Sequence, residues 1–172
     1  MNDQKRNVLL LSAGRRVELM QAFRGELDRR GLQVQLLATD LRPELSAACQ
    51  QADASFPVPR VTDPGYLGRL LDLGVLQQVG LVIPTIDTEL LGLAQSRERF
   101  ADRGIHVVVS SEALVEQCRD KRRTAGLFEN LDIDFPRLFS KEAIQFPCFT
   151  KPYDGSRSIG AAHLRSEEAL TA

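Results

Sequence analysis

The sequence contains no tryptophan, only two histidines and three cysteines, and almost no net charge. Cys49, Cys118 and Cys148 are far apart, odd in number and form no CxxC pair, which excludes a readable disulfide framework or zinc knuckle. With 22 basic and 23 acidic side chains, no electrostatic force favours nucleic acid or an anionic membrane. Neither of these partners is expected.

Long hydrophobic runs are also missing. The longest apolar run near the N-terminus extends from Val8 to Leu11, which is too short for a signal peptide and far short of the roughly 20 residues that span a bilayer. The scattered cysteines and the lack of a leader predict a reduced, soluble, cytoplasmic protein. A length of 172 residues fits one domain, or one domain and part of a second.

Short apolar runs alternate with helical periodicity over the first 110 residues. Asp63 and Pro64 have the residue types of a helix N-cap and first helical position, and Gly31 suits a left-handed C-terminal cap. Strands joined by helices require parallel crossovers, which predicts an α/β fold with a Rossmann-like, doubly wound parallel sheet. The predicted strands are 8–11, 34–38, 54–58, 81–83 and 107–109, and the predicted helices are 17–27, 41–51, 64–73 and 90–100.

This alternation stops after Ser110. Two helical stretches, 112–118 and 120–130, are followed by strand-like segments at 148–151 and 159–164. We therefore predict a first domain of residues 1–111 and a second region of residues 112–172, which is small for an independent core.

Three loops of the first domain carry polar groups at the carboxyl ends of predicted strands, where doubly wound sheets bind ligands. The loop from Ser12 to Arg16 leads into a helix N-terminus, which favours an anion. Asp40 could bind a ligand or form a local turn, and Asp87 could bind a ligand or cap the next helix. The candidate substrate-binding residues are Ser12, Gly14, Arg15, Asp40, Thr85, Asp87 and Glu89.

The same loop allows us to weigh another function, that of a nicotinamide-dependent oxidoreductase. A dinucleotide site of that class uses a G-x-G-x-x-G turn, and the loop from Ser12 to Arg16 contains one glycine. The missing fingerprint counts against this function.

The second region carries a different set of polar groups. Lys121 follows Asp120 at a helix start, and Lys151 interrupts an otherwise apolar strand. The segment 154–160 reads as a hairpin turn, and its small residues and Arg157 also allow a polyphosphate to approach backbone N–H groups. Phosphoryl transfer needs such positioning and charge neutralisation, although a solvated charged turn is the simpler interpretation of Lys121.

Taken together, these motifs make the chain similar to the ATP-grasp superfamily, in particular to the carbamoyl-phosphate-synthase large-subunit-like ligases. The order and spacing of the motifs carry the resemblance, since none is decisive alone. They are LSAGRRVEL at 11–19, ATD at 38–40, IPTIDTEL at 83–90, DK at 120–121, FP at 135–136, FTKP at 149–152 and GSRSIG at 155–160.

The resemblance implies a pre-ATP-grasp domain over residues 1–111, which helps to form the substrate site, and the first portion of an α+β ATP-grasp lobe over residues 112–172. In this family a carboxylate is activated as an acyl phosphate, and an amine or similar nucleophile then attacks it. ATP and Mg²⁺ are the implied cofactors, with an amino acid or small carboxylate as substrate. The implied ATP-binding residues are Lys121, Lys151, Gly155, Ser156, Ser158 and Gly160.

The segment 155–160 resembles the family's flexible flap, which closes over the phosphates of ATP. The family's adenine hinge, acidic Mg²⁺ ligands and second lobe follow that flap, so we expect the metal ligands beyond Ala172 and assign no metal-binding residue here. The 172-residue chain is accordingly not expected to turn over ATP alone. The alternative function is a non-catalytic small-molecule binding module. A truncated lobe would expose apolar surface that predicts a homodimer or disorder, carried by Phe135, Phe139, Phe146 and Phe149.

Overall fold

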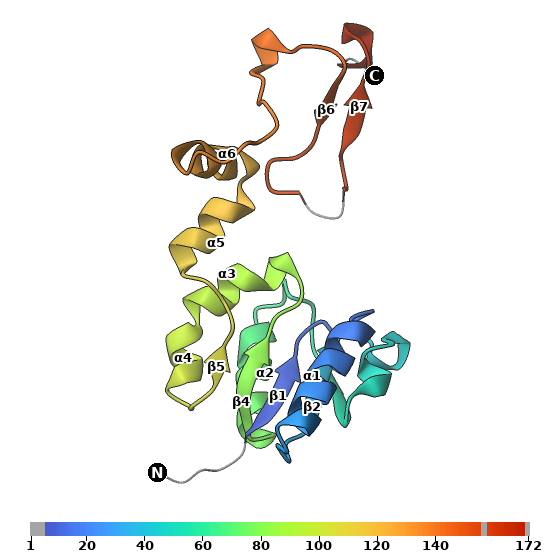
Figure 1. The fold of residues 1–172 in the computed structure, drawn as a ribbon, viewed down its shortest axis with the longest axis vertical. Helices are drawn as coiled ribbons and strands as arrows, with labels where there is room; N and C mark the ends of the chain where they lie inside the picture. The colour runs from blue at the N-terminus through green and yellow to red at the C-terminus, as the bar shows by residue number, and fades with distance from the viewer. Residues whose placement is uncertain (1–5, 156–157, 171–172) are drawn as a thin grey trace. The chain divides into compact units, whose positions relative to one another are not determined.

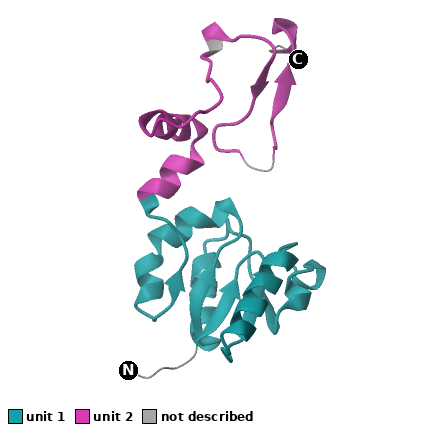
Figure 2. Cartoon of the chain, in the orientation of Figure 1, with its two compact units in different colours: residues 1–112 teal, residues 113–172 magenta. Residues whose placement is uncertain are grey.

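The computed structural model describes residues 6–155 and 158–170. The chain divides into two compact units, residues 1–112 and residues 113–172 (Figure 2). Among the described residues, no helix has both the length and the apolar character needed to cross a bilayer.

A five-stranded parallel sheet forms the centre of the first unit (Figure 1). Its order is β3-β2-β1-β4-β5, so the chain reverses its direction of winding on either side of β1. This topology confirms the predicted Rossmann-like α/β fold. The strands are β1 (Asn7–Leu10), β2 (Leu36–Asp40), β3 (Ala54–Pro57), β4 (Val79–Ile83) and β5 (His106–Val107).

Helices connect these strands. The connections contain α1 (Val17–Arg29), the 3₁₀ turns η1 (Pro43–Leu45) and η2 (Cys49–Gln51), α2 (Tyr66–Leu76), α3 (Asp87–Gln95) and α4 (Arg97–Ala101). Gly31 follows α1 with φ of +63°, and the N–H of Leu32 donates to the carbonyl of Leu27, so the predicted left-handed C-terminal cap is confirmed.

Side chains that alternate along the strands fill two cores, one on each face of the sheet. Leu9 and Leu37 belong to the larger core, together with Tyr66 of α2 and Phe100 of α4. Val8 and Leu10 belong to the other core, which packs against Met20 of α1. Because β1 is buried on both faces, its sequence is a continuous apolar run rather than an alternating one.

Three predicted helices differ from the structure. The α2 helix begins at Tyr66, because Asp63 forms a turn: its Oδ1 accepts from the N–H of Gly65 at 2.7 Å. The predicted helix 90–100 begins earlier and is divided into α3 and α4 at Ser96, whose φ of −98° and ψ of 4° leave the helical range. The predicted helix 41–51 consists only of the two 3₁₀ turns.

The second unit contains few regular elements. They are most of α5 (Glu112–Arg119), α6 (Lys121–Asn130), η3 (Lys141–Ala143), the antiparallel pair β6 (Cys148–Thr150) and β7 (Ala162–Leu164), and η4 (Glu167–Leu170). Asp120 is the N-cap of α6, as the Asp-Lys sequence indicates, and accepts a hydrogen bond from the N–H of Arg122 at 2.9 Å. The strand predicted at 159–164 is limited to residues 162–164.

Candidate functional site

Three loops meet at the carboxyl ends of β1, β2 and β4, where the winding direction reverses. The N–H of Gly14 after β1 donates to Asp40 Oδ2 at the end of β2, at 3.0 Å. Thr85 Oγ1 after β4 donates to the carbonyl oxygens of Leu11 and Ser12, each at 2.9 Å. Hydrogen bonds between residues far apart in sequence therefore hold the first loop in place.

The backbone of this first loop is unusual. Ser12 has φ of +46°, a conformation that costs free energy for a residue with a side chain. Gly14 has φ of +51°, and its carbonyl accepts hydrogen bonds from Ser46 Oγ and the N–H of Ala48, both at 3.0 Å. A Cβ at Gly14 would lie 3.6 Å from the nearest atom, so the positive φ, and not crowding, favours glycine there.

Glu89 is the most deeply buried of the predicted site residues, with 1% of its surface exposed. Its Oε1 accepts hydrogen bonds from Ser12 Oγ and from Tyr66 Oη, each at 2.5 Å. Its Oε2 is buried and has no well-aligned hydrogen-bond donor among the described residues. Burial raises the pKa of Glu89, although the Ser12 and Tyr66 hydroxyls and the nearby backbone N–H groups of Thr85 and Ile86 oppose this effect.

Tyr66 was not predicted as a site residue. It is 2% exposed, and burial together with the neighbouring Glu89 raises the pKa of its hydroxyl. A buried tyrosine hydroxyl normally has a hydrogen-bond partner, which was the only signal in the sequence. That signal does not identify Glu89, which lies on another helix.

Asp40 and Asp87 each had two interpretations. Asp40 forms a local turn, since its Oδ1 accepts from the N–H of Arg42 at 3.3 Å, and it also binds the Gly14 loop through Oδ2. Asp87 is exposed and is the first residue of α3, while Ile86 occupies the N-cap position.

The two arginines of the first loop lie on the surface. Arg15 and Arg16 are exposed, and Arg16 Nη2 donates to the carbonyl of Thr85 at 3.2 Å. The structure therefore links Ser12, Gly14, Asp40, Thr85 and Glu89 by hydrogen bonds and leaves Arg15 beside them on the outside.

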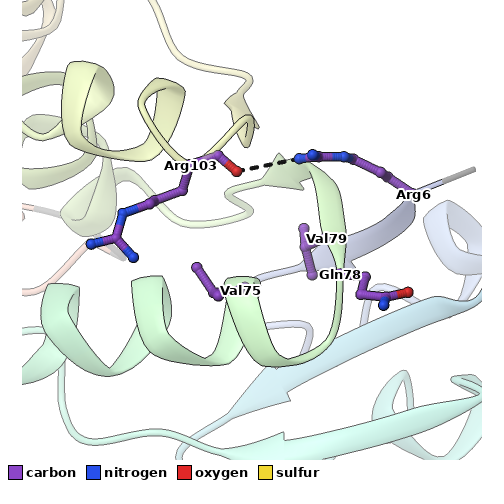
Figure 3. A pocket seen from close by; sticks show the side chains of 6 residues that line it. Arg6, Val75, Gln78, Val79 and Arg103 are labelled. Atoms are coloured by element: carbon purple, nitrogen blue, oxygen red, sulfur yellow. Dashed lines mark hydrogen bonds between the residues drawn. The ribbon is translucent and has the colours of Figure 1, made fainter. Parts of the chain in front are cut away.

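A pocket of about 190 Å³ lies at the opposite, amino ends of the strands (Figure 3). Arg6 donates from Nη1 to the carbonyls of Arg103 and Gly104, at 3.3 and 2.7 Å. Figure 3 shows the side chain of Arg103 pointing away from Arg6. None of the predicted site residues lines this pocket, and the Arg6 contacts anchor the turn before β5, which is a structural role.

The second unit contains a pocket of about 400 Å³. Lys121 and Lys151, 30 positions apart in sequence, both line it, and none of the described acidic residues does. Two further cations, Arg122 and Arg137, complete a positively charged wall. The remaining lining residues are Leu138, Phe139, Ile144, Cys148, Phe149, Thr150, Pro152, Tyr153 and Leu164.

Backbone carbonyls hold Lys121 in this pocket. Its Nζ donates to the carbonyl of Gly155 at 2.6 Å and to that of Tyr153 at 3.4 Å. Arg122 binds Asp120 Oδ2 at 2.6 Å, and its guanidinium carbon lies 4.1 Å from the centre of the Tyr153 ring. The charge and hydrogen bonds of Arg122 hold the pKa of Asp120 well below its usual range.

The other predicted ATP-binding residues lie between β6 and β7. Gly155 is half-buried, while Ser158 and Gly160 are exposed and have φ of +58° and +73°. Ser156 and its neighbour Arg157 lie outside the described residues.

A magnesium site does not fit the described residues. No group of three or more His, Cys, Asp or Glu side chains within 6–155 and 158–170 is arranged to hold a metal ion. In the Ser12 site, the two oxygens of Asp40 and Oε1 of Glu89 already accept hydrogen bonds from Gly14, Arg42, Ser12 and Tyr66. No metal chemistry can be assigned to these residues.

Solved structures with a similar fold include carboxylases. The biotin carboxylase domain of 2-oxoglutarate carboxylase from Hydrogenobacter thermophilus, solved with MgADP, ADP and bicarbonate, has a TM-score of 0.64 and 19% identity, covering 98% of this chain and 39% of that one. Pyruvate carboxylase from Rhizobium etli, solved with acetyl coenzyme A, has a TM-score of 0.65 and 16% identity, covering 96% and 16%. This chain therefore spans well under half of either protein. No curated protein matches it.

A family model matches most of the first unit. The model of the PylC-like, N-terminal domain matches residues 8–108, which is more than half of the chain and includes all three loops of the Ser12 site. Together with the carboxylase fold, this match confirms the resemblance to ATP-grasp enzymes. The chain belongs to the PylC-like N-terminal domain family, and its first unit is a pre-ATP-grasp domain.

Proposed function

We propose that this chain is the N-terminal part of an ATP-dependent carboxylate–amine ligase of the ATP-grasp type. The observation that supports this proposal is the pocket of the second unit, in which Lys121 and Lys151 share one wall with two arginines and no carboxylate. Such a surface favours a polyphosphate as its ligand, because phosphate oxygens form strong, charge-assisted hydrogen bonds with lysine and arginine side chains. The similar biotin carboxylase domain from Hydrogenobacter thermophilus was solved with MgADP, which agrees with this choice.

The proposed reaction has two steps. A carboxylate oxygen of the substrate attacks the γ-phosphorus of ATP, ADP leaves, and an acyl phosphate forms. The amine of a second substrate then attacks the acyl carbon, and inorganic phosphate leaves as the amide bond forms. Lys121 and Lys151 would offset the negative charge on the transferring oxygens, which is the main requirement of phosphoryl transfer.

Lys121 retains capacity for a ligand. An ammonium group has three hydrogens, and the carbonyls of Gly155 and Tyr153 accept two of them. The third hydrogen is available for a phosphate oxygen without loss of either contact. We therefore assign Lys121 to a fixed phosphate contact and Lys151, which is exposed directly after β6, to a second contact that forms on binding.

Titration of the purified chain with ATP, followed by isothermal calorimetry, tests the nucleotide site. Lys151→Ala should weaken ATP binding by about tenfold or more, the usual cost of a lost charge-assisted hydrogen bond. Arg165→Ala removes an exposed cation of the same unit that does not line the pocket, and it should bind ATP like the unchanged chain. Equal affinities for the Lys151 and Arg165 variants would refute the assignment.

A second candidate is a non-catalytic small-molecule binding module. The contacts that favour it are those of the Ser12 site, all of which lie within residues 1–112 and need nothing from the nucleotide pocket. Thermal-shift measurements separate the two candidates. Stabilisation by amino acids or small carboxylates without any stabilisation by ATP would favour the module.

A further inference from the structure

The hydroxyl hydrogens at the Ser12 site have a fixed direction. Ser12 Oγ and Tyr66 Oη both lie 2.5 Å from the same oxygen of Glu89. A hydroxyl carries one hydrogen, and Glu89 Oε1 accepts from both hydroxyls. Each hydroxyl therefore uses its hydrogen on Glu89, and its oxygen has only lone pairs left for another partner.

Access to this cluster is limited to one of its three members. Glu89 and Tyr66 are 1% and 2% exposed, whereas Ser12 is half-buried and lies next to the exposed Arg15. A ligand at the carboxyl edge of the sheet can therefore contact Ser12 Oγ, but Glu89 only through it. Such a ligand would contact the Ser12 Oγ atom as a hydrogen-bond acceptor, and the Glu89 side chain lies on the buried side of that atom.

A second carboxylate lies on the other side of the same loop. Asp40 Oδ2 accepts from the N–H of Gly14 at 3.0 Å, and the side chain is half-buried. Each of its oxygens has a further lone pair. Negative charge thus flanks the loop from Ser12 to Gly14 on both sides, which opposes the preference of the α1 N-terminus for an anion.

We infer that Glu89 and Tyr66 are positioning residues that hold the Ser12 hydroxyl as an acceptor, so that this loop binds a primary ammonium group in preference to a carboxylate or a phosphate. The inference rests on the proposed function in one respect, since the ammonium group would belong to the amine or amino-acid substrate. On this inference the ammonium group of the ligand binds Ser12 Oγ, and Arg15 is available to bind an anionic group of the same ligand.

The direct test uses the whole chain, labelled with ¹⁵N, and three simple probes at matched ionic strength and neutral pH. Ethylammonium should cause saturable shifts of the backbone N–H signals of Ser12, Ala13 and Gly14, while acetate and inorganic phosphate should not. Saturation of these signals by acetate or phosphate, or the lack of saturation by ethylammonium, would overturn the inference.

Variants separate a positioning role from a structural one. In Glu89→Gln the amide can donate to Ser12 Oγ, which frees the serine hydrogen to point outward. The affinity for ethylammonium should then fall by about tenfold, as for a lost charge-assisted contact, and acetate should begin to bind. A side chain that only supports the fold would not exchange the two preferences. Glu98→Gln, on an exposed part of α4, is the matched control.

Two further variants keep the test decisive if Glu89→Gln does not fold. Ser12→Ala should abolish the ethylammonium response, and Tyr66→Phe should weaken it while leaving the preference for the cation unchanged. Full ethylammonium affinity in Ser12→Ala would refute the inference. The same spectra give the ATP response of Gly155 and Lys151, so a failure of the nucleotide proposal is seen separately from a failure at Ser12.

Discussion

The two units of this chain position their polar groups in opposite ways. In the first unit the polar side chains of the Ser12 site lie against a core that contains the largest fully buried residues, and their hydrogen bonds join loops 26 to 77 positions apart. In the second unit only Val115, Ala125 and Leu164 are buried apolar residues among those described, and the cations of the pocket are mostly exposed. The first site is held by hydrogen bonds against a packed core, whereas the second is more exposed.

This contrast has a functional meaning. A site that recognises one group on a small substrate gains from fixed acceptors, because no ordering cost is left to be met on binding. A pocket that closes on a polyphosphate instead needs side chains that can move. The different packing of the units therefore agrees with substrate recognition in the first and nucleotide binding in the second, as proposed above.

The largest expected effect is on stability and concerns the core of the first unit. Leu9→Ala removes a fully buried side chain of β1 and should lower the free energy of unfolding by about 3 kcal/mol, through lost burial and a residual cavity. Urea unfolding followed by circular dichroism measures it. A loss below about 1 kcal/mol, the range of mild substitutions, would contradict the tight packing of this unit.

The next effect concerns the bonds that hold the Ser12 loop. Thr85→Val preserves the side-chain shape but removes the donor to the carbonyls of Leu11 and Ser12, and it should cost about 1–2 kcal/mol. Thr88→Val, one turn away and exposed, should change the free energy of unfolding by less than about 0.5 kcal/mol. Equal effects of the two variants would show that Thr85 does not hold the loop.

The third effect is a pH dependence that comes from Glu89 in the first unit. Since the pKa of Glu89 is raised in the folded state, the folded chain binds this proton more tightly than the unfolded chain. Its contribution to stability is fully present below the unfolded value of 4.5 and is lost as the pH rises through the folded pKa. Urea midpoints measured from acid to neutral pH should therefore fall less steeply with pH in Glu89→Gln than in the unchanged chain. Parallel profiles would contradict this.

The smallest effect is expected in the second unit. Phe149→Ala removes a side chain that is 76% exposed and stacks on His163 with ring centres 4.8 Å apart. The free energy of unfolding should change by less than about 0.5 kcal/mol, as for other surface substitutions. Measured in the same urea series as Leu9→Ala, a loss of comparable size would remove the difference in packing between the two units.

The apolar surface predicted for the second unit is only partly visible in its exposures. Phe149 is strongly exposed, while Phe135, Phe139 and Phe146 are half-buried. Phe135 packs against Phe128 of α6, with ring centres 6.5 Å apart. Self-association through this surface stays a prediction, which sedimentation of the unchanged chain and of Phe149→Ala would test.

The strands of the first unit were predictable because each is a short apolar run between turn residues. Helix boundaries were less accurate where a polar residue can play two roles. Asp63 suits an N-cap, but its carboxylate accepts from the N–H of Gly65 and closes a turn directly before α2. The division at Ser96 had no local signal, since Leu90 and Phe100 continue one apolar pattern across it. In the candidate site, the loops could be predicted from their places after strands.

The sequence by itself determined which residues reach the carboxyl edge of the sheet, because strand ends and helix starts follow from local patterns. It could not determine that Glu89 lies behind Ser12 with Tyr66 beside it. Those contacts depend on how α2 and α3 pack against the sheet, and packing of distant segments is a property of the whole fold. The tertiary structure alone therefore decided which hydroxyl groups donate to Glu89.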